Sequence, residues 1–155
     1  MKLRAHGMAV DAPTGWEVRI AQRTPEGQAP GARPRPMLHA ATVPLPAVRG
    51  DFGGGVTPLL TAEDLFVSLF EYEPEACATP LFATRGRPRP AAGDFGPNRL
   101  QRSIAGQSGR QWFFQEDGRA FCLYVVLGSH ARRAELVTRL NAVLATLVLD
   151  AGPTR

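Results

Sequence analysis

The sequence predicts an α+β fold in which a predominantly antiparallel sheet of about six to seven strands is covered by a long C-terminal helix. Residues 121–127 are apolar throughout and residues 65–72 mostly so, as strands buried on both faces require. From about 130 to 146, leucines and valines recur at helical spacing, with Ser129 as the candidate N-cap. We therefore expect this helix to cover one face of the sheet.

A two-residue turn fixes how the last two long strands pair. Asp117-Gly118 lies between two apolar runs, and glycine tolerates the positive φ that a type I′ turn needs. This turn predicts the register of the hairpin: Phe114 opposite Phe121, Phe113 opposite Cys122 and Trp112 opposite Leu123. Since side chains alternate along a strand, both faces of the hairpin are apolar.

The other predicted elements are short and are separated by turn residues. Sequential short strands favour an antiparallel sheet. Proline- and glycine-rich loops are expected over residues 24–36, 44–58 and 85–97. We expect strands at 3–10, 16–22, 37–43 and 99–105, the first two forming an opening hairpin, a helical turn within 74–83 and a final edge strand at 147–149.

Size and composition narrow the class of protein. The 155 residues suit one domain over 1–150 with a tail at 151–155. The net charge is +4, and 17 of the 18 basic residues are arginine, a bias that a GC-rich coding sequence also produces. The basic residues are dispersed without stacking aromatics between them, so no nucleic-acid partner is expected. Without a signal segment or a run of about 18 apolar residues, we expect a cytoplasmic protein with no membrane partner.

The order of the elements resembles a known group of folds. A Pro13-Thr14-Gly15-Trp16 turn leads into a series of antiparallel strands, and a hairpin into an apolar strand is followed by a closing amphipathic helix. This order resembles the Mog1/PsbP-like α-β-α sandwich group, and the chain also looks like short actinobacterial-type proteins of unknown function. The resemblance implies a small bacterial scaffold that binds other proteins, such as a small GTPase or a photosynthetic complex, usually without catalysis. It transfers no functional residue.

Three motifs resemble catalytic or metal-binding motifs but lack the context that the chemistry needs. Asp51-Phe52-Gly53 and Asp94-Phe95-Gly96 spell the metal-binding tripeptide of kinases, but Lys2 is the sole lysine, so we interpret both as turns. Residues 106–110 approach the G-x-S-x-G nucleophile elbow, yet they lie between two predicted strands rather than between a strand and a helix. We interpret this motif as a turn too.

The histidines and cysteines give no local pattern for a metal or a nucleophile. His6, His39 and His130 are far apart in sequence, and neither cysteine has a histidine or a second cysteine at ligand spacing. A Cys122–histidine pair could form in space, but an apolar strand raises the pKa of a thiol and makes it a poor nucleophile. The sequence therefore predicts no catalytic residue, no metal and no cofactor.

The most unusual feature is a tetrapeptide that occurs twice, at residues 33–36 and 87–90. Both copies read Arg-Pro-Arg-Pro, and proline presets an extended backbone that projects the arginines at low entropic cost. Such loops suit a carboxylate, a phosphate or an acidic protein surface; the alternative is that they are solvated connectors. The candidate partner-binding residues are Arg33, Arg35, Arg87 and Arg89.

These observations predict a non-catalytic protein-interaction module, an adaptor or accessory protein rather than an enzyme. The expected partner is another protein, and a homo-oligomer is kept as an alternative. A second hypothesis is a small-molecule-binding or hydrolytic domain that uses the concave sheet face near Phe113, Cys122 and Tyr124. A third is a structural subunit of a larger assembly.

Overall fold

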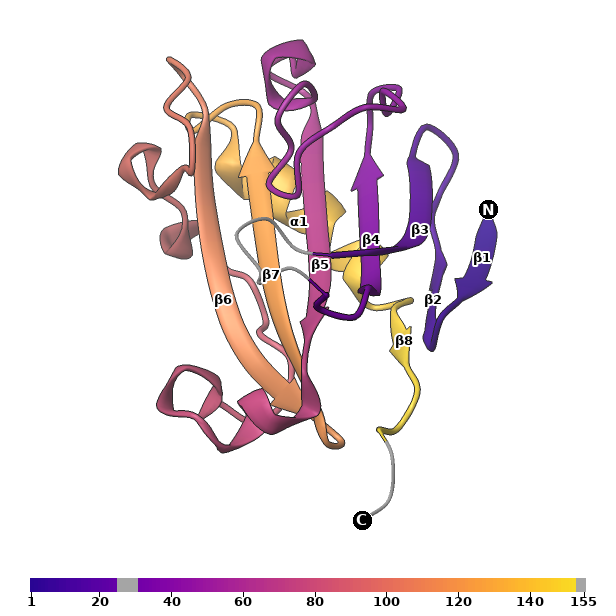
Figure 1. Ribbon diagram of the computed structural model, residues 1–155. Coiled ribbons are helices and arrows are strands. Elements are labelled where there is room, and N and C mark those ends of the chain that lie inside the picture. The colour runs from indigo at the N-terminus through magenta and orange to yellow at the C-terminus, as the bar shows by residue number, and fades with distance from the viewer. Residues whose placement is uncertain (25–30, 153–155) are drawn as a thin grey trace.

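The computed structural model describes residues 1–24 and 31–152 and has an α+β architecture with two antiparallel sheets (Figure 1). The larger sheet has five strands in the order β3-β4-β5-β7-β6, and the smaller has three in the order β1-β2-β8. The strands and the helix are β1 (Lys2–Ala5), β2 (Met8–Asp11), β3 (Glu17–Arg23), β4 (Arg35–Ala41), β5 (Leu65–Tyr72), β6 (Ser108–Glu116), β7 (Arg119–Leu127), α1 (Arg133–Leu144) and β8 (Val148–Leu149).

The hairpin of β6 and β7 has the predicted register. Phe114 lies opposite Phe121, Phe113 opposite Cys122 and Trp112 opposite Leu123. The turn between the strands places Asp117 at a φ of 50° and Gly118 at a φ of 80°, as a type I′ turn requires. Every residue of β7 is buried, which confirms the prediction of a central strand covered on both faces.

The main core lies between the larger sheet and α1, which Figure 1 shows behind that sheet. Leu136, Leu140 and Val143 of the helix are buried in one cluster with sheet residues such as Leu69 and Leu123. The helix is shorter than the predicted range of 130–146. The Ser129 hydroxyl accepts a hydrogen bond from the Arg132 amide at 3.3 Å, so it stabilises the turn before the helix rather than the helix itself.

Loops and short 3₁₀ turns cover the other face of the larger sheet. Phe52 contacts both Phe70 and Tyr124 edge to face, at centroid distances of 5.2 and 5.4 Å. The predicted helical turn within residues 74–83 is present as two 3₁₀ turns, Pro74–Ala78 and Pro80–Phe82. In the part of the chain that the structure describes, these segments rather than a second α-helical layer cover this face.

Three details of the predicted sheet are wrong. Residues 3–10 form two strands, β1 and β2, because the chain reverses at His6-Gly7, where both residues have positive φ. Strand β2 then pairs with β8 and not with β3, which gives two sheets with eight strands instead of one with about six or seven. Residues 99–105 form no strand: Pro97–Arg99 is a 3₁₀ turn, and the bridge to β6 lies just before it, between Gly96 and Gly109.

One side chain joins the two sheets and the C-terminal segment. Arg119, at the start of β7, donates two hydrogen bonds to the carboxylate of Glu71, at 2.9 and 2.8 Å. Its third nitrogen donates to the carbonyl oxygens of Gly7 and Asp150, at 2.8 and 3.0 Å. The guanidinium also lies over the Phe121 ring, 4.9 Å from the centroid. Arg119 is therefore a buried, fully engaged cation at the junction of the fold.

Candidate functional site

The two arginine-rich loops lie on opposite faces of the larger sheet. Arg33 is exposed just before β4, and Arg35 opens that strand on the face that points away from α1. Arg87 and Arg89 belong to a loop that packs beside the C-terminal end of α1, where the Asn141 amide donates to the carbonyl oxygen of Pro90 at 2.9 Å. The four predicted residues therefore do not form one surface.

Arg87 is engaged within the molecule. Its Nε and one terminal nitrogen donate to the Glu116 carboxylate at 2.9 and 2.7 Å, and the other terminal nitrogen donates to the Leu147 carbonyl oxygen at 2.6 Å. The hydrogen bond and charge of Glu116 raise the pKa of Arg87. Arg89, by contrast, is exposed at a groove of about 450 Å³ that Pro88 and Leu144 also line. Of this pair, Arg89 is the side chain available to a partner.

A second group of arginines gathers where β3 and β4 pair. Cross-strand register places Arg23 opposite Arg35 and Arg19 opposite His39, and the loop after β4 adds Arg49. We call Arg19, Arg23, Arg35 and Arg49 the arginine cluster. Among the described residues, two carboxylates accompany its four cations: Glu17 pairs with Arg19, and the buried Asp51 pairs with Arg23 at 3.0 Å. The cluster therefore carries an excess of positive charge.

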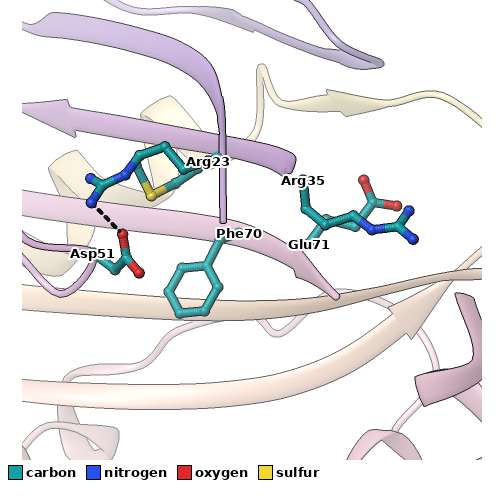
Figure 2. Close-up of a pocket in the computed structure, with 6 residues that line it drawn as sticks. Arg23, Arg35, Asp51, Phe70 and Glu71 are labelled. Atoms are coloured by element: carbon teal, nitrogen blue, oxygen red, sulfur yellow. Dashed lines mark ion pairs between the residues drawn. The ribbon is translucent and has the colours of Figure 1, made fainter. Parts of the chain in front are cut away.

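Figure 2 shows that the side chains of Arg23 and Arg35 point in different directions. Arg23 points toward Asp51, whereas Arg35 extends away from Asp51, past Glu71. The crevice between them leaves no room for a water molecule. The Arg35 Nε is buried and has no hydrogen-bond partner among the described residues, since Arg119 takes the carboxylate of Glu71. Arg35 is therefore the arginine of the cluster whose side chain makes no hydrogen bond or ion pair with a described residue.

His39 lies beneath the cluster and is fully buried. The Arg49 Nε–H donates to His39 Nδ1 at 2.7 Å, so the ring proton must sit on Nε2, which donates to the Asp51 carbonyl oxygen at 3.0 Å. Ser68 donates its hydroxyl to the same carbonyl oxygen at 2.7 Å. Because the Ser68 hydroxyl donates to this carbonyl oxygen rather than to His39, Ser68 and His39 do not form a nucleophile–base pair. The network anchors the loop around Asp51 to the sheet.

The protonation states in this network follow from burial and from the surrounding cations. Burial, together with the charges of Arg49 and Arg23, lowers the pKa of His39 to about 4, against the raising effect of its hydrogen bond to Asp51. Burial and repulsion from Arg23 and Arg19 lower the pKa of Arg49. His39 is thus neutral at neutral pH, and the positive potential comes from the arginines alone.

The sheet face near Phe113, Cys122 and Tyr124 is largely covered. Cys122 is fully buried, and burial raises the pKa of its thiol to about 12; Gln111 donates a hydrogen bond to Sγ at 3.2 Å. The Tyr124 hydroxyl accepts a hydrogen bond from the Gln101 amide at 2.8 Å. A protonated thiol in this setting is a packing group, not a nucleophile.

We expect Cys122 to resist thiol reagents in the folded protein, because its thiol is both buried and protonated. In a Cys77→Ser background, Ellman's reagent should label Cys122 only as guanidinium unfolds the chain. In a Cys122→Ala variant, the labelling rate of the half-buried Cys77 gives the value for comparison. Labelling of native Cys122 as fast as in the unfolded chain would contradict the packing described above.

Sequence reasoning missed Arg19, Arg23, Arg49 and Asp51 as members of a common site. The alternation of Val18 and Ile20 with polar residues could have put Arg19 and Arg23 on one face, but nothing in the sequence brings the glycine-rich loop onto them.

Neither a metal site nor a similarity to known proteins identifies a function for the described residues. Over residues 1–24 and 31–152, no group of three or more His, Cys, Asp or Glu side chains could hold a metal ion. No helix in the same ranges is long and apolar enough to cross a membrane. Comparison of the chain with family models, with curated proteins and with solved structures gave no match.

Proposed function

We propose that this protein is a non-catalytic interaction module, an adaptor or accessory protein that binds an acidic segment of a partner protein at the arginine cluster and the adjoining Arg33. One observation carries the proposal: among the described residues, Arg35 belongs to a group in which four arginines face two carboxylates, and its own guanidinium pairs with no carboxylate there. Arginine binds carboxylates through two parallel hydrogen bonds, which makes a partner's Asp or Glu the fitting ligand.

An exposed apolar residue beside the cluster supports a protein partner. Val48 precedes Arg49 and is 90% exposed, although the loop around it is anchored through His39 and Asp51. Arginines next to exposed apolar side chains are typical of protein interfaces, where Arg is enriched and an apolar contact excludes water. A segment that combines acidic and apolar residues is therefore the partner that this surface fits.

The proposal also covers the type of scaffold, the cellular location and a second candidate contact. The antiparallel α+β architecture with its closing helix supports part of a Mog1/PsbP-like scaffold, although loops and 3₁₀ turns stand where an α-β-α sandwich has its second helical layer. A cytoplasmic location agrees with a protein partner. Arg87 and Arg89 remain a second candidate contact on the α1 side, where Arg89 has the freer side chain.

Fluorescence anisotropy with a fluorescein-labelled glutamate-rich peptide tests the proposal. The Arg33→Gln/Arg35→Gln variant should bind the peptide about tenfold more weakly than the parent, the loss of about 1.4 kcal/mol expected for two partly exposed charge pairs. Lys2→Gln/Arg4→Gln removes the same charge from β1 and should bind as the parent does.

Two results would contradict this assignment. Equal weakening in both double variants would mean that only net charge matters, and weakening in Arg89→Gln alone would move the interface to the α1 side. A single-stranded oligonucleotide of matched charge that outcompetes the peptide would replace the protein partner with nucleic acid.

A further inference from the structure

A separate cavity of about 280 Å³ lies on the face of the larger sheet that points away from α1. It lies between the glycine-rich loop after β4 and the segment that precedes β6, and it is open to solvent on one side. Its walls are formed by the backbone of Gly50 and Gly54, the rings of Phe52 and Tyr124, and the side chains of Gln101 and Arg102. The cavity is distinct from Arg33 and Arg35, which do not line it.

Tyr124 places an unused hydrogen-bond donor at this cavity. The residue is only 1% exposed, and its hydroxyl oxygen accepts the Gln101 amide at 2.8 Å. The hydroxyl proton has no acceptor within the described residues, and burial raises the pKa of this phenol, so the proton stays in place at neutral pH. A buried hydroxyl normally both accepts and donates a hydrogen bond. The site therefore lacks an acceptor for the Tyr124 hydroxyl proton, which a ligand can supply.

Arg102 adds a positive charge at the same cavity. It is exposed, and its guanidinium makes no hydrogen bond or ion pair with any residue that the structure describes. Asp51 also lines the cavity, but its carboxylate is paired with Arg23 at 3.0 Å. The uncompensated charge on the wall is thus positive, next to the hydroxyl donor.

The walls are held in place before any ligand arrives. Gly50 and Gly54 are joined by a backbone hydrogen bond of 2.9 Å, and Gly53 donates to Gly50 at 3.0 Å. Gly53 has a φ of 85°, and a Cβ at this position would lie 2.7 Å from the Phe66 ring, so the loop needs glycine there. A preformed cavity binds without a large ordering cost.

We propose that this cavity binds a small organic carboxylate, whose oxygens accept hydrogen bonds from the Tyr124 hydroxyl and the Arg102 guanidinium while its apolar body lies against the Phe52 and Tyr124 rings. The aromatic walls favour an organic body over a bare inorganic anion. Arg33 and Arg35 of the protein-binding surface proposed above do not line this site, although Asp51, which pairs with Arg23 of the arginine cluster, does.

Benzoate, added to ¹⁵N-labelled protein and followed by ¹H–¹⁵N NMR, is the probe that tests this proposal. Saturable shifts should be confined to the amides of residues 50–57 and 101–102 and to β7 near Tyr124. Arg102→Gln should weaken benzoate binding about tenfold, because it removes the unpaired positive charge from the described part of the wall, and its exposed position should leave the fold intact. Arg132→Gln, at an exposed arginine near α1, is the matched control and should bind benzoate unchanged.

Several outcomes would overturn the carboxylate site. These are shifts that do not saturate or are scattered over the surface, equal affinity in Arg102→Gln, equal affinity for the neutral isostere benzamide, or equally tight binding of inorganic phosphate. Binding of benzoate should persist in Arg33→Gln/Arg35→Gln, and binding of the glutamate-rich peptide should persist in Arg102→Gln. The failure of one proposal is thereby distinguished from the failure of the other.

Discussion

Replacing Arg119 with methionine is expected to lower the free energy of unfolding by about 3–5 kcal/mol, measured by urea denaturation at pH 7. Both partners of the Arg119–Glu71 ion pair are buried, with side chains 7% and 9% exposed. The substitution leaves the Glu71 carboxylate buried without its cation and removes the donors to Gly7 and Asp150 that tie the small sheet to the large one. Leaving one buried charge unpaired costs more than the ion pair itself contributes.

A double variant separates the unpaired charge from the loss of packing. Arg119→Met/Glu71→Leu removes both charges and should recover a large part of the stability that the single variant loses, because no buried carboxylate remains. Arg132→Met removes an arginine from the exposed pair with Glu63 and should cost less than about 1 kcal/mol. A loss below about 1 kcal/mol in Arg119→Met would contradict the role of this ion pair.

Lowering the pH from 7 to 4 is expected to remove about 3 kcal/mol of stability through His39 alone. Its pKa is about 4 in the folded protein and 6.5 in the unfolded chain, and a shift of one unit corresponds to 1.36 kcal/mol. Because the folded value is the lower one, the unfolded chain takes up the proton first as the pH falls. The stability is complete above pH 6.5, is lost between 6.5 and about 4, and changes no further below that range.

The measurement compares unfolding free energies at pH 7 and pH 4 in the parent and in His39→Gln. The variant should lose about 3 kcal/mol less between the two pH values, even if it is less stable at pH 7. The charged groups that act on the ring are Arg49 and Arg23, and the ring donates to the backbone carbonyl of Asp51. Asp64 has a lowered pKa, so its contribution is lost below its ordinary value of 3.8 and lies outside this window. Equal pH dependence in parent and variant would refute the neutral, buried state of His39.

The elements that the sequence predicts best are those whose information is local. The Asp117-Gly118 turn sets the register of β6 and β7 because both turn residues adopt positive φ, and the register then follows by counting. The mostly apolar run at residues 65–72 and the leucine spacing in α1 are likewise patterns that span only neighbouring residues.

The second sheet was not predictable in this way. Strand β8 has two residues, and it pairs with β2 from the opposite end of the chain. No local pattern encodes such a pairing. The turn that creates β2 rests on His6 at a φ of 52°, and histidine is a weaker turn signal than asparagine or glycine.

The arrangement of the candidate site was also not predictable from local sequence. The two Arg-Pro-Arg-Pro copies are identical in sequence, yet Arg87 is held by Glu116 and Leu147 whereas Arg35 lies in a group of like charges. Asp51 and Asp94 both lie in turns, as predicted, but the Asp94 carboxylate accepts a hydrogen bond from the Ala91 amide within its own turn, whereas the Asp51 carboxylate pairs with Arg23. These differences come from tertiary contacts that a tetrapeptide or a tripeptide does not specify.

NMR of the arginine Nε–H groups, titrated with the glutamate-rich peptide, tests the central proposal most directly. The Nε–H groups of Arg87, Arg119 and Arg49 already donate to Glu116, Glu71 and His39, so their signals should stay in place and serve as internal references. The Arg35 Nε–H signal, whose donor has no described partner, should move with saturation, together with that of Arg33. A titration in which Arg35 stays fixed, or in which all exposed arginines shift alike, would contradict a specific carboxylate-binding surface.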